Sequence, residues 1–313
     1  MGLSASVIVR SKDKVSTIEA TLRSVREQTV RAELVVVDSG STDGTLEVAH
    51  RLADRVELIA PEDFTYGGAL NVGARAASGD VHFALSAHSV PYSGCWVERS
   101  LARYARADVA GTNSGRRTPD GRDIVGVHHQ SARDAVEHGW WGFSNHGGSW
   151  RASVWQDEPF REDLPASEDK EWSWRVLARG WTIAYAPDLG VSSTHRRQAG
   201  LRALFRRVRK ERSAMLALGA VEPRSLAGSV HAWWNPPTFP EHRPLAVRRC
   251  SPWRLVEHAA EYLSDRDPPP PVPNPALTEL RRQVADGPRP GRRAVSDAAG
   301  PAGRPAPRRP GAG

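Results

Sequence analysis

The sequence predicts an α/β fold built on a parallel sheet, with a helical extension at its C-terminal end. A strand, a helix and a second strand follow one another within about 35 residues, and a crossover of this kind makes the two strands parallel. Apolar runs of strand length then alternate with helical segments as far as Val81 to Leu85. From Leu201 onward the periodicity is helical.

Each element of the predicted sheet has its own sequence signal. The strands are short runs of apolar and β-branched residues, and the helices have apolar residues three and four positions apart. A capping box of Ser16 and Glu19 marks the start of the first helix. The expected strands are 6–10, 34–37, 56–59 and 81–85, and the expected helices are about 16–28, 46–53, 68–77 and 168–178.

Polar residues follow two of these strands directly. Ser86 and His88 come after the strand 81–85 and before Pro91, which cannot continue it. Ligands of open α/β sheets bind beyond the carboxyl ends of parallel strands, so both side chains are predicted to face a ligand crevice. The loop from Asp38 to Thr45 follows the second strand. Its small residues suit either a close approach to a ligand or an ordinary turn capped by Asp43, and the loop alone does not decide between them.

Composition excludes several classes of protein. The chain has 313 residues, of which 39% are hydrophobic, enough for a substantial core. Cys95 and Cys250 are too few for a disulfide framework, which favours a reducing compartment. No apolar run reaches the ~18 to 20 residues of a membrane span, and the N-terminus lacks a signal-peptide pattern. We therefore expect a cytoplasmic protein.

Charge is unevenly distributed along the chain. Residues 191–313 contain 22 Lys and Arg against 10 Asp and Glu, whereas residues 1–190 contain 21 against 26. The basic part lacks the interleaved aromatic residues of RNA-binding proteins, so no nucleic-acid partner is expected. Residues 199–218 within it have the pattern of a basic amphipathic helix. This helix either contacts the inner face of a membrane peripherally or packs on the rest of the protein with its arginines in solvent.

Several motifs in the first 200 residues together resemble one enzyme family. They are VVVDSGSTDGT at residues 35–45, FTYGGALNVGARAASGD at 64–80, PASEDKEW at 165–172 and GWTIAYAPDLGVSSTH at 180–195. Their order resembles that of inverting family 2 glycosyltransferases, in particular the rhamnosyltransferase-like branch. The resemblance implies a GT-A fold, in which a Rossmann-like nucleotide-binding sheet carries helices on both faces.

The resemblance also implies a donor and an acceptor. The donor would be a nucleotide-diphosphate sugar, such as the dTDP-deoxysugar dTDP-rhamnose. The acceptor would be a hydroxyl of a glycan, of a lipid-linked substrate or of a small molecule. The residues expected to bind the donor are Arg10, Asp38, Ser39, Asp43, Asn71, Ser86 and His88.

One position departs from the family pattern. Family members usually have Asp-x-Asp, or a single Asp, where this chain has Ser86-Ala87-His88, and the last carboxylate holds a divalent metal. Ser86 is a poor metal ligand, and His88 suits Mn2+ better than Mg2+. Three interpretations stay open: a divalent metal, Mn2+ or Mg2+, held by His88 and His195; a metal-independent transferase in which His88 donates to phosphate; and a catalytically degenerate protein.

The acceptor side of the predicted site is the start of the helix 168–178. The helix dipole alone favours carboxylates in a first turn. An inverting transfer also needs a base on the acceptor hydroxyl, and similarity to the family's ED motif assigns this role to Asp169 and an acceptor contact to Glu168. Trp172 is expected beside the acceptor, because seven of the eleven tryptophans lie between residues 140 and 181 and indole rings stack on sugars. A tryptophan-rich core is the simpler explanation for any one of them.

These observations divide the chain into three parts. Residues 1–198 form the expected GT-A domain, and residues 199–266 form a basic helical extension. Residues 267–313 contain no aromatic residue beyond Asp267 and hold 12 of the 24 prolines, so a disordered tail is expected there. The predicted function is glycosyl transfer. The alternatives are a sugar-nucleotide-binding protein that has lost catalysis and a basic membrane- or RNA-binding scaffold.

Overall fold

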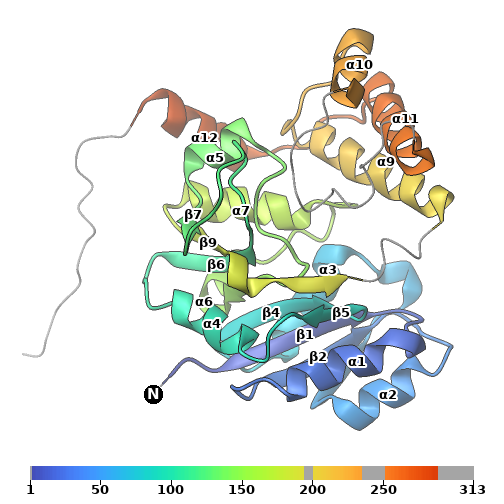
Figure 1. Cartoon of the computed structure of the whole chain (residues 1–313), viewed down its shortest axis with the longest axis vertical. Coiled ribbons are helices and arrows are strands. Elements are labelled where there is room, and N and C mark those ends of the chain that lie inside the picture. The colour runs from blue at the N-terminus through green and yellow to red at the C-terminus, as the bar shows by residue number, and fades with distance from the viewer. Residues whose placement is uncertain (1, 194–199, 235–250, 288–313) are drawn as a thin grey trace, which may run out of the picture.

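A mixed eight-stranded sheet runs through the protein in the order β3-β2-β1-β4-β8-β6-β9-β7 (Figure 1). The computed structural model describes residues 2–193, 200–234 and 251–287. The strands of the large sheet are β1 Ala5–Ser11, β2 Glu33–Asp38, β3 Arg55–Leu58, β4 Val81–Ser86, β6 Val109–Ser114, β7 His128–His129, β8 Ser149–Arg151 and β9 Thr182–Ala186. A second, two-stranded sheet pairs β5 Ser89–Pro91 with β10 Val191–Ser193.

The N-terminal half of the large sheet has the predicted parallel pairing. β1 lies between β2 and β4 and is parallel to both, and β3 is parallel to β2. β8 is antiparallel to both of its neighbours, β4 and β6. The carboxyl ends of β1, β2 and β4 therefore meet at one edge, where ligands of such sheets bind.

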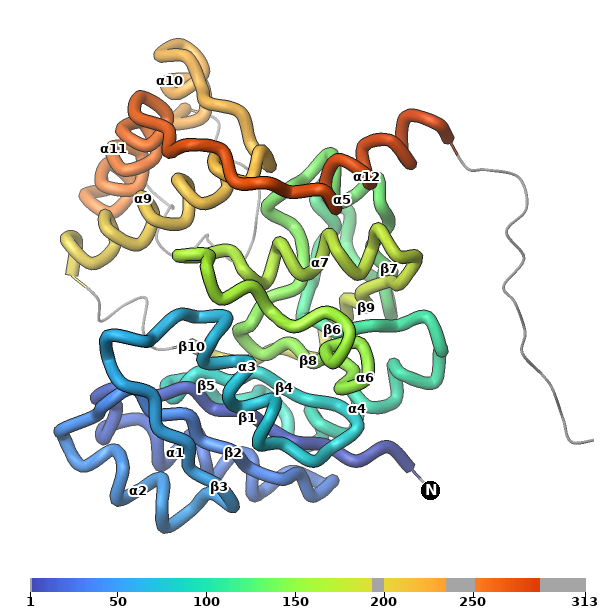
Figure 2. The backbone as a smooth tube through the Cα atoms, turned by 180° about the vertical axis from the view of Figure 1, so that it is seen from behind, coloured from blue at the N-terminus to red at the C-terminus, as the bar shows by residue number. Residues whose placement is uncertain are grey.

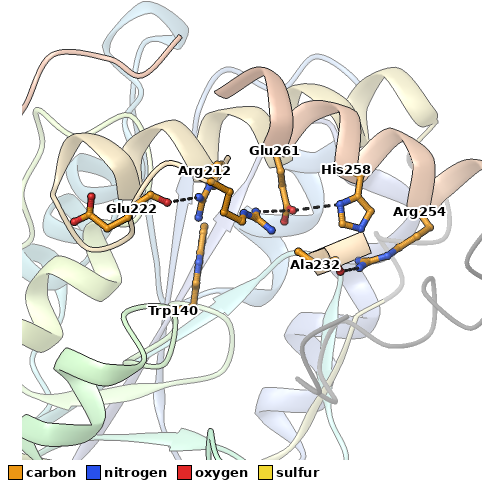
Figure 3. A pocket seen from close by; sticks show the side chains of 8 residues that line it. Trp140, Arg212, Glu222, Ala232, Arg254, His258 and Glu261 are labelled. Atoms are coloured by element: carbon orange, nitrogen blue, oxygen red, sulfur yellow. Dashed lines mark hydrogen bonds and ion pairs between the residues drawn. The ribbon is translucent and has the colours of Figure 1, made fainter. Parts of the chain in front are cut away.

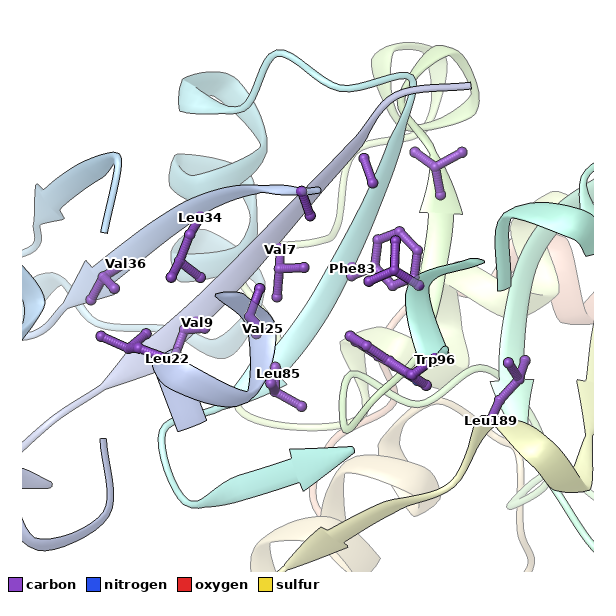
Figure 4. Close-up of a cluster of buried hydrophobic side chains, with 14 of the residues drawn as sticks. Val7, Val9, Leu22, Val25, Leu34, Val36, Phe83, Leu85, Trp96 and Leu189 are labelled. Atoms are coloured by element: carbon purple, nitrogen blue, oxygen red, sulfur yellow. The ribbon is translucent and has the colours of Figure 1, made fainter. Parts of the chain in front are cut away.

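Helices cover both faces of the sheet, as predicted. One face packs against α1 Val15–Arg26, α2 Thr45–Leu52 and α4 Trp96–Arg103 in a core that includes Leu22, Phe83 and Trp96 (Figure 4). The other face packs against α3 Tyr66–Ala76, α6 Ala152–Asp157 and α7 Glu168–Ala178. The remaining short elements are η1 Pro61–Asp63, α5 Ala132–Glu137 and η2 Pro187–Leu189.

Two glycines let α3 approach its neighbours closely. A Cβ atom on Gly73 would lie 2.3 Å from Cγ2 of Ile8, so α3 rests directly on β1. A Cβ atom on Gly67 would lie 2.1 Å from the carbonyl oxygen of Arg161. These contacts require glycine, since real Cβ atoms do not come so close to other atoms.

The start of α1 differs from the prediction. Lys14 is its N-cap, and no side chain of its own segment caps it, so the Ser16–Glu19 capping box is wrong. Instead, the N–H groups of Lys14 and Val15 donate to side chains of the β2–α2 loop and of the first residue of α2. Tertiary contacts have replaced a local cap.

The C-terminal extension is helical, as predicted. It contains α9 Leu201–Ala217, α10 Leu226–Trp234 and α11 Pro252–Arg266. Arg212 of α9 and Asp265 of α11 form a buried ion pair at 2.6 Å, which joins the two helices. Within the described ranges, no helix is both long enough and apolar enough to cross a membrane.

The prediction of a disordered tail is wrong for one segment. Residues Pro275–Ala285 form α12, which lies beside α5 and α7 (Figure 2). Its buried residues Leu277 and Leu280 join a core cluster with Trp174 of α7. The Asn274 side chain caps the helix at the N–H of Leu277, at 3.2 Å. The Asn-Pro start and the apolar spacing were present in the sequence, but the high proline content concealed them. The rest of the expected tail, residues 288–313, lies outside the described residues.

Candidate functional site

The carboxyl ends of β1 and β4 form the floor of the candidate site. Arg10 and Ser86 are register partners on these adjacent strands. The N–H of Ala87 donates to the carbonyl oxygen of Arg10 at 3.1 Å. The guanidinium carbon of Arg10 lies 5.7 Å from the centre of the Tyr66 ring, at the start of α3. The site therefore opens on the α3 side of the sheet.

Asn145 brings the first turn of α7 to the same edge. Its backbone N–H donates to Asp169 Oδ2 at 3.2 Å, and its side-chain amide donates to Glu168 Oε1. Its carbonyl oxygen accepts from Arg10 Nη2 at 3.4 Å. Ser167, directly before the helix, has a φ of 66°, in the left-handed region that residues other than glycine rarely occupy. Such strain persists only where the surroundings impose it, and it is typical of functional sites.

Glu168 and Asp169 are adjacent but have different environments. Glu168 is 2% exposed, and burial, followed by the charge of Asp169, raises its pKa to about 7 against the opposing effect of Arg10. Burial also lowers the pKa of Arg10, while both carboxylates act in the opposite direction. The Asp169 side chain is 14% exposed. Asp169 is therefore the more accessible carboxylate of the pair.

The loop after β2 is shaped by hydrogen bonds to Asp38. This carboxylate is fully buried and accepts from the N–H groups of Gly40 and Ser41, at 3.0 and 2.7 Å. It also accepts from the hydroxyls of Ser11 and Ser41, at 2.6 Å each. Ser39 is 3% exposed. Asp38 and Ser39 thus act on the site by fixing the loop, and the direct donor contact predicted for them is not available in this conformation.

Asp43 caps two helices at once. Its Oδ2 accepts from the N–H of Val15 in α1, and its Oδ1 accepts from the N–H of Thr45 in α2, both at 3.1 Å. The hydrogen bond from the Thr45 hydroxyl is the main cause of a lowered Asp43 pKa. This geometry supports the helix-cap interpretation, although the residue also remains exposed at the edge of the site.

The residues at the end of β4 do not suit a divalent metal. Ser86 offers a hydroxyl and His88 one imidazole, in place of carboxylates. No group of three or more His, Cys, Asp or Glu side chains suited to a metal ion occurs within residues 2–193, 200–234 and 251–287. His195, the second predicted ligand, lies outside these ranges. The ligand set in the described part of the chain therefore does not fit such an ion.

Comparison with known families identifies the family of this chain. The family described as glycosyl transferase family 2 matches residues 6–166, more than half of the chain. The chain belongs to glycosyl transferase family 2. The matched segment contains β1, β2 and β4, whose carboxyl ends form the floor of the site, together with the loop after β2.

Two curated glycosyltransferases match part of this chain. Glycosyltransferase AglE of Haloferax volcanii is 27% identical over 203 residues, which cover 59% of this chain and 64% of AglE. An uncharacterized glycosyltransferase of Nostoc is 32% identical over 127 residues, which cover 38% of each protein. The chain therefore spans less than two thirds of the length of either relative.

Solved structures confirm the GT-A fold. A mannosyltransferase of Pyrobaculum calidifontis, in complex with GDP-Man and Mn2+, is 19% identical with a TM-score of 0.56, covering 91% of this chain and 80% of the other. Staphylococcus aureus TarS 1–349 with UDP is 14% identical with a TM-score of 0.52, covering 85% and 92%. Glucosyl-3-phosphoglycerate synthase of Mycobacterium tuberculosis, with Mn2+ and UDP, is 19% identical with a TM-score of 0.51, covering 69% and 78%. At these identities the likeness concerns the fold alone.

Asn71 has a structural role in this family 2 protein, contrary to the donor-binding prediction. Its amide nitrogen donates to the carbonyl oxygen of Phe160 and to Glu162 Oε1, at 2.8 Å each. Its amide oxygen accepts from Trp155 Nε1 at 2.9 Å and from the N–H of Phe160 at 3.0 Å. All of its hydrogen-bonding capacity is used to hold the segment after α6 against α3.

The tryptophans also form core rather than an acceptor groove. Trp172 is fully buried and donates its indole N–H to the carbonyl oxygen of Glu158 at 2.9 Å, so the predicted acceptor contact is wrong for it. Trp150 and Trp174 are fully buried as well, and Trp141 is 7% exposed. Trp141, Trp150 and Trp172 belong to the core cluster between the sheet and α7, whereas Trp174 belongs to the cluster that α7 forms with α5 and α12.

Sequence reasoning missed three residues of the site: Tyr66, Asn145 and Lys210. Asn145 lies in the turn before β8, where Gly147 has a φ of 81°, and this Gly-rich turn was the only local signal. The ammonium nitrogen of Lys210, from α9, lies 4.7 Å from the centre of the Tyr66 ring. No local pattern predicts that contact, because it joins residues from two separate parts of the chain.

A cavity of about 300 Å³ lies elsewhere, between the C-terminal extension and Trp140 (Figure 3). The charged groups in its wall are paired with one another or with close neighbours. Arg224 lies 2.8 Å from Glu261, and Arg254 lies 3.7 Å from Glu257. Burial, with a smaller effect of Arg254, lowers the pKa of His258 to about 4. We assign this network to the packing of α9 against α11, and the candidate site to the sheet edge, where the family motifs meet.

Proposed function

We propose that this chain is a glycosyltransferase that moves a sugar from a nucleotide-diphosphate donor to an acceptor hydroxyl with inversion. The observation that carries the proposal is the placement of Asp169. Its partly exposed carboxylate is held by Asn145 beside Arg10, at the edge where family 2 motifs converge. A positioned carboxylate at such an edge suits a general base.

The proposed reaction is a single displacement. Asp169 takes the proton of the acceptor hydroxyl while the acceptor oxygen forms a bond to the anomeric carbon of the sugar. The bond from that carbon to the diphosphate oxygen breaks, and its electron pair leaves with the nucleoside diphosphate. Attack from the opposite side inverts the anomeric centre. Glu168, buried behind Asp169, orients Asn145 and so acts as a positioning residue.

The donor class follows from the family, and its finer identity remains a proposal. Structural relatives are described with GDP-Man, UDP or UDP-GlcNAc, so the nucleotide base varies among them. The resemblance to the rhamnosyltransferase-like branch makes dTDP-rhamnose the first donor to test. Two of the structural relatives are described with Mn2+, but the described residues of this chain supply no fitting ligand set. The proposed mechanism therefore contains no step that depends on a metal.

The acceptor and the place of action are proposed from the C-terminal extension. The buried residues of α9 include Leu204 and Met215, whereas Arg206 and Arg209 are exposed. This pattern favours packing of its apolar side over insertion into a bilayer. Its exposed arginines still suit peripheral contact with an anionic surface. We propose a cytoplasmic enzyme that can meet a lipid-linked acceptor at the inner membrane face through residues 199–218.

A donor screen tests this proposal. Thermal unfolding of the full chain would be followed with dTDP-rhamnose, UDP-GlcNAc, UDP-glucose and GDP-mannose, with and without Mn2+. A donor that binds the native state raises the midpoint in a concentration-dependent way. The donor that does so would then be tested for hydrolysis and transfer, with the anomeric configuration read by NMR. Binding without turnover would favour the degenerate protein, and no binding of any nucleotide sugar would reject the proposed function.

A further inference from the structure

The end of β4 lacks the charge that the proposed reaction requires. As the sugar departs, negative charge develops on the diphosphate, and an enzyme must neutralise it. Ser86 carries no charge, and His88 offers one imidazole. Candidates for this task are therefore cations from other elements, and two of them lie against a single aromatic ring.

Arg10 is the first of these cations. It pairs in register with Ser86, so it lies beside the strand end at which the family resemblance places the diphosphate. Its Nε and Nη1 have no hydrogen-bond partner among the described residues, although both atoms are buried. Its Nη2 has only a long contact, 3.4 Å, to the carbonyl oxygen of Asn145. Buried guanidinium donors without partners are costly, and an anion bound there would satisfy them.

Lys210 is the second cation. It is exposed on α9, and its ammonium nitrogen lies 4.7 Å from the centre of the Tyr66 ring. The guanidinium carbon of Arg10 lies 5.7 Å from the centre of the same ring. Lys210 forms no ion pair with another residue of the described ranges. Two cations beside one ring repel each other unless an anion lies between or above them.

We propose that Arg10 and Lys210, which both lie against the Tyr66 ring, neutralise the leaving diphosphate in place of a divalent metal. This inference rests on the proposed function. It gives the basic helix α9 a role in the site, since α9 delivers Lys210 to the entrance of the sheet edge. The covalent step is unchanged: the electron pair of the broken bond goes to the diphosphate oxygen, which these two cations stabilise.

The chain offers a matched control for Lys210. Arg209 precedes it on the same helix and carries the same charge, but its guanidinium is directed to Asp267, at 3.9 Å. Lys210→Ala and Arg209→Ala therefore remove one positive charge each from the same basic surface. A general electrostatic attraction of α9 for anions would be weakened equally by both. A specific contact would be weakened by Lys210→Ala alone.

The test is calorimetric titration of dTDP, UDP and GDP into the full chain and both variants, in excess EDTA and separately with Mn2+. We expect a nucleoside diphosphate to bind in EDTA. We expect Lys210→Ala to weaken this binding by at least about tenfold, the loss that follows removal of one charge-assisted contact. Arg209→Ala should bind as the wild type does, and the affinity for the corresponding nucleoside, which lacks phosphate, should not change in either variant.

Other outcomes would overturn the inference. Binding that requires Mn2+ and is unaffected by Lys210→Ala would indicate a metal held by residues outside the described ranges. Equal weakening of diphosphate binding by both substitutions would indicate a general electrostatic attraction of α9 for anions. If no nucleoside diphosphate binds under either condition, the proposed function itself fails, and this result differs from both of the others.

Discussion

The donor side and the acceptor side of the site are built in different ways. On the donor side, the carboxylates of Asp38 and Asp43 accept from residues of the same βαβ unit, at most 28 positions away. On the acceptor side, Asp169 accepts from Asn145, 24 positions away, whose carbonyl oxygen accepts from Arg10, 135 positions away in the sequence. Asp38 is fully buried and accepts four hydrogen bonds, whereas the Asp169 carboxylate accepts, among the described residues, only from the backbone N–H groups of Asn145 and Lys170 and lies 3.8 Å from the Lys170 ammonium. The number of carboxylate lone pairs that already accept hydrogen bonds within the protein decides which carboxylate can still act on a ligand.

The largest expected effect is that of Asp169→Asn on turnover. Asparagine keeps the shape and polarity of the side chain but cannot accept the acceptor proton. We expect kcat to fall by about 10²- to 10⁴-fold, or roughly 3 to 5 kcal/mol of barrier, with donor affinity and folding retained. The measurement is steady-state transfer with a confirmed donor and acceptor, beside a donor titration.

Asp163→Asn is the matched control for this substitution. Asp163 lies six residues earlier, and its side chain is 64% exposed and paired with Arg161. The Asp163→Asn variant should transfer sugar at the wild-type rate. If Asp169→Asn also turned over normally, the difference between the two sides of the site would have no catalytic meaning, and Asp169 would be a helix-terminal charge only.

A smaller effect is expected from replacing Glu168. It concerns how the free energy of unfolding depends on pH. Its pKa is raised to about 7 in the folded protein from a usual 4.5, so folding favours the protonated acid. This stabilisation is complete below about pH 4.5 and is lost as the pH rises through 7. Glu168→Gln removes the ionisation, so relative to wild type the variant should gain up to about 3 kcal/mol between pH 5 and pH 8.

Urea denaturation at several pH values measures this difference. Glu137→Gln is the control, since the Glu137 side chain is 50% exposed and pairs with Arg133 on its own helix. That variant should follow the wild-type pH dependence. Parallel curves for Glu168→Gln and wild type would mean that Glu168 is ionised throughout this range and does not differ from an ordinary surface carboxylate.

The smallest expected effect is on the donor side. Asp43→Ala removes the shared cap of α1 and α2, which should lower the free energy of unfolding by about 1 kcal/mol. Because its oxygens already accept hydrogen bonds from the first residues of α1 and α2, donor affinity should change little. Thermal unfolding and a donor titration on the same preparation measure both quantities. A large loss of donor affinity without a loss of stability would instead make Asp43 a donor ligand, and the two sides would then be alike.

Most of the N-terminal fold could be predicted from local patterns. The strands β1, β2 and β4 and the helices between them differ from expectation by one or two residues at their ends, because apolar periodicity and short crossovers are properties of adjacent residues. The docking of α12 was missed for the opposite reason. Its apolar residues are few, and they are buried only because α5 and α7 form a surface that receives them.

The same division applies to the site residues. Sequence motifs alone determined the family, the edge of the sheet and the pair Glu168 and Asp169, since each is a short run of letters. Only the tertiary structure decided that Asp38 and Asn71 are saturated, that Trp172 is core, and that Arg10 and Lys210 meet at the Tyr66 ring. Burial and hydrogen-bond saturation depend on which distant segments meet, and no local pattern of residues records that.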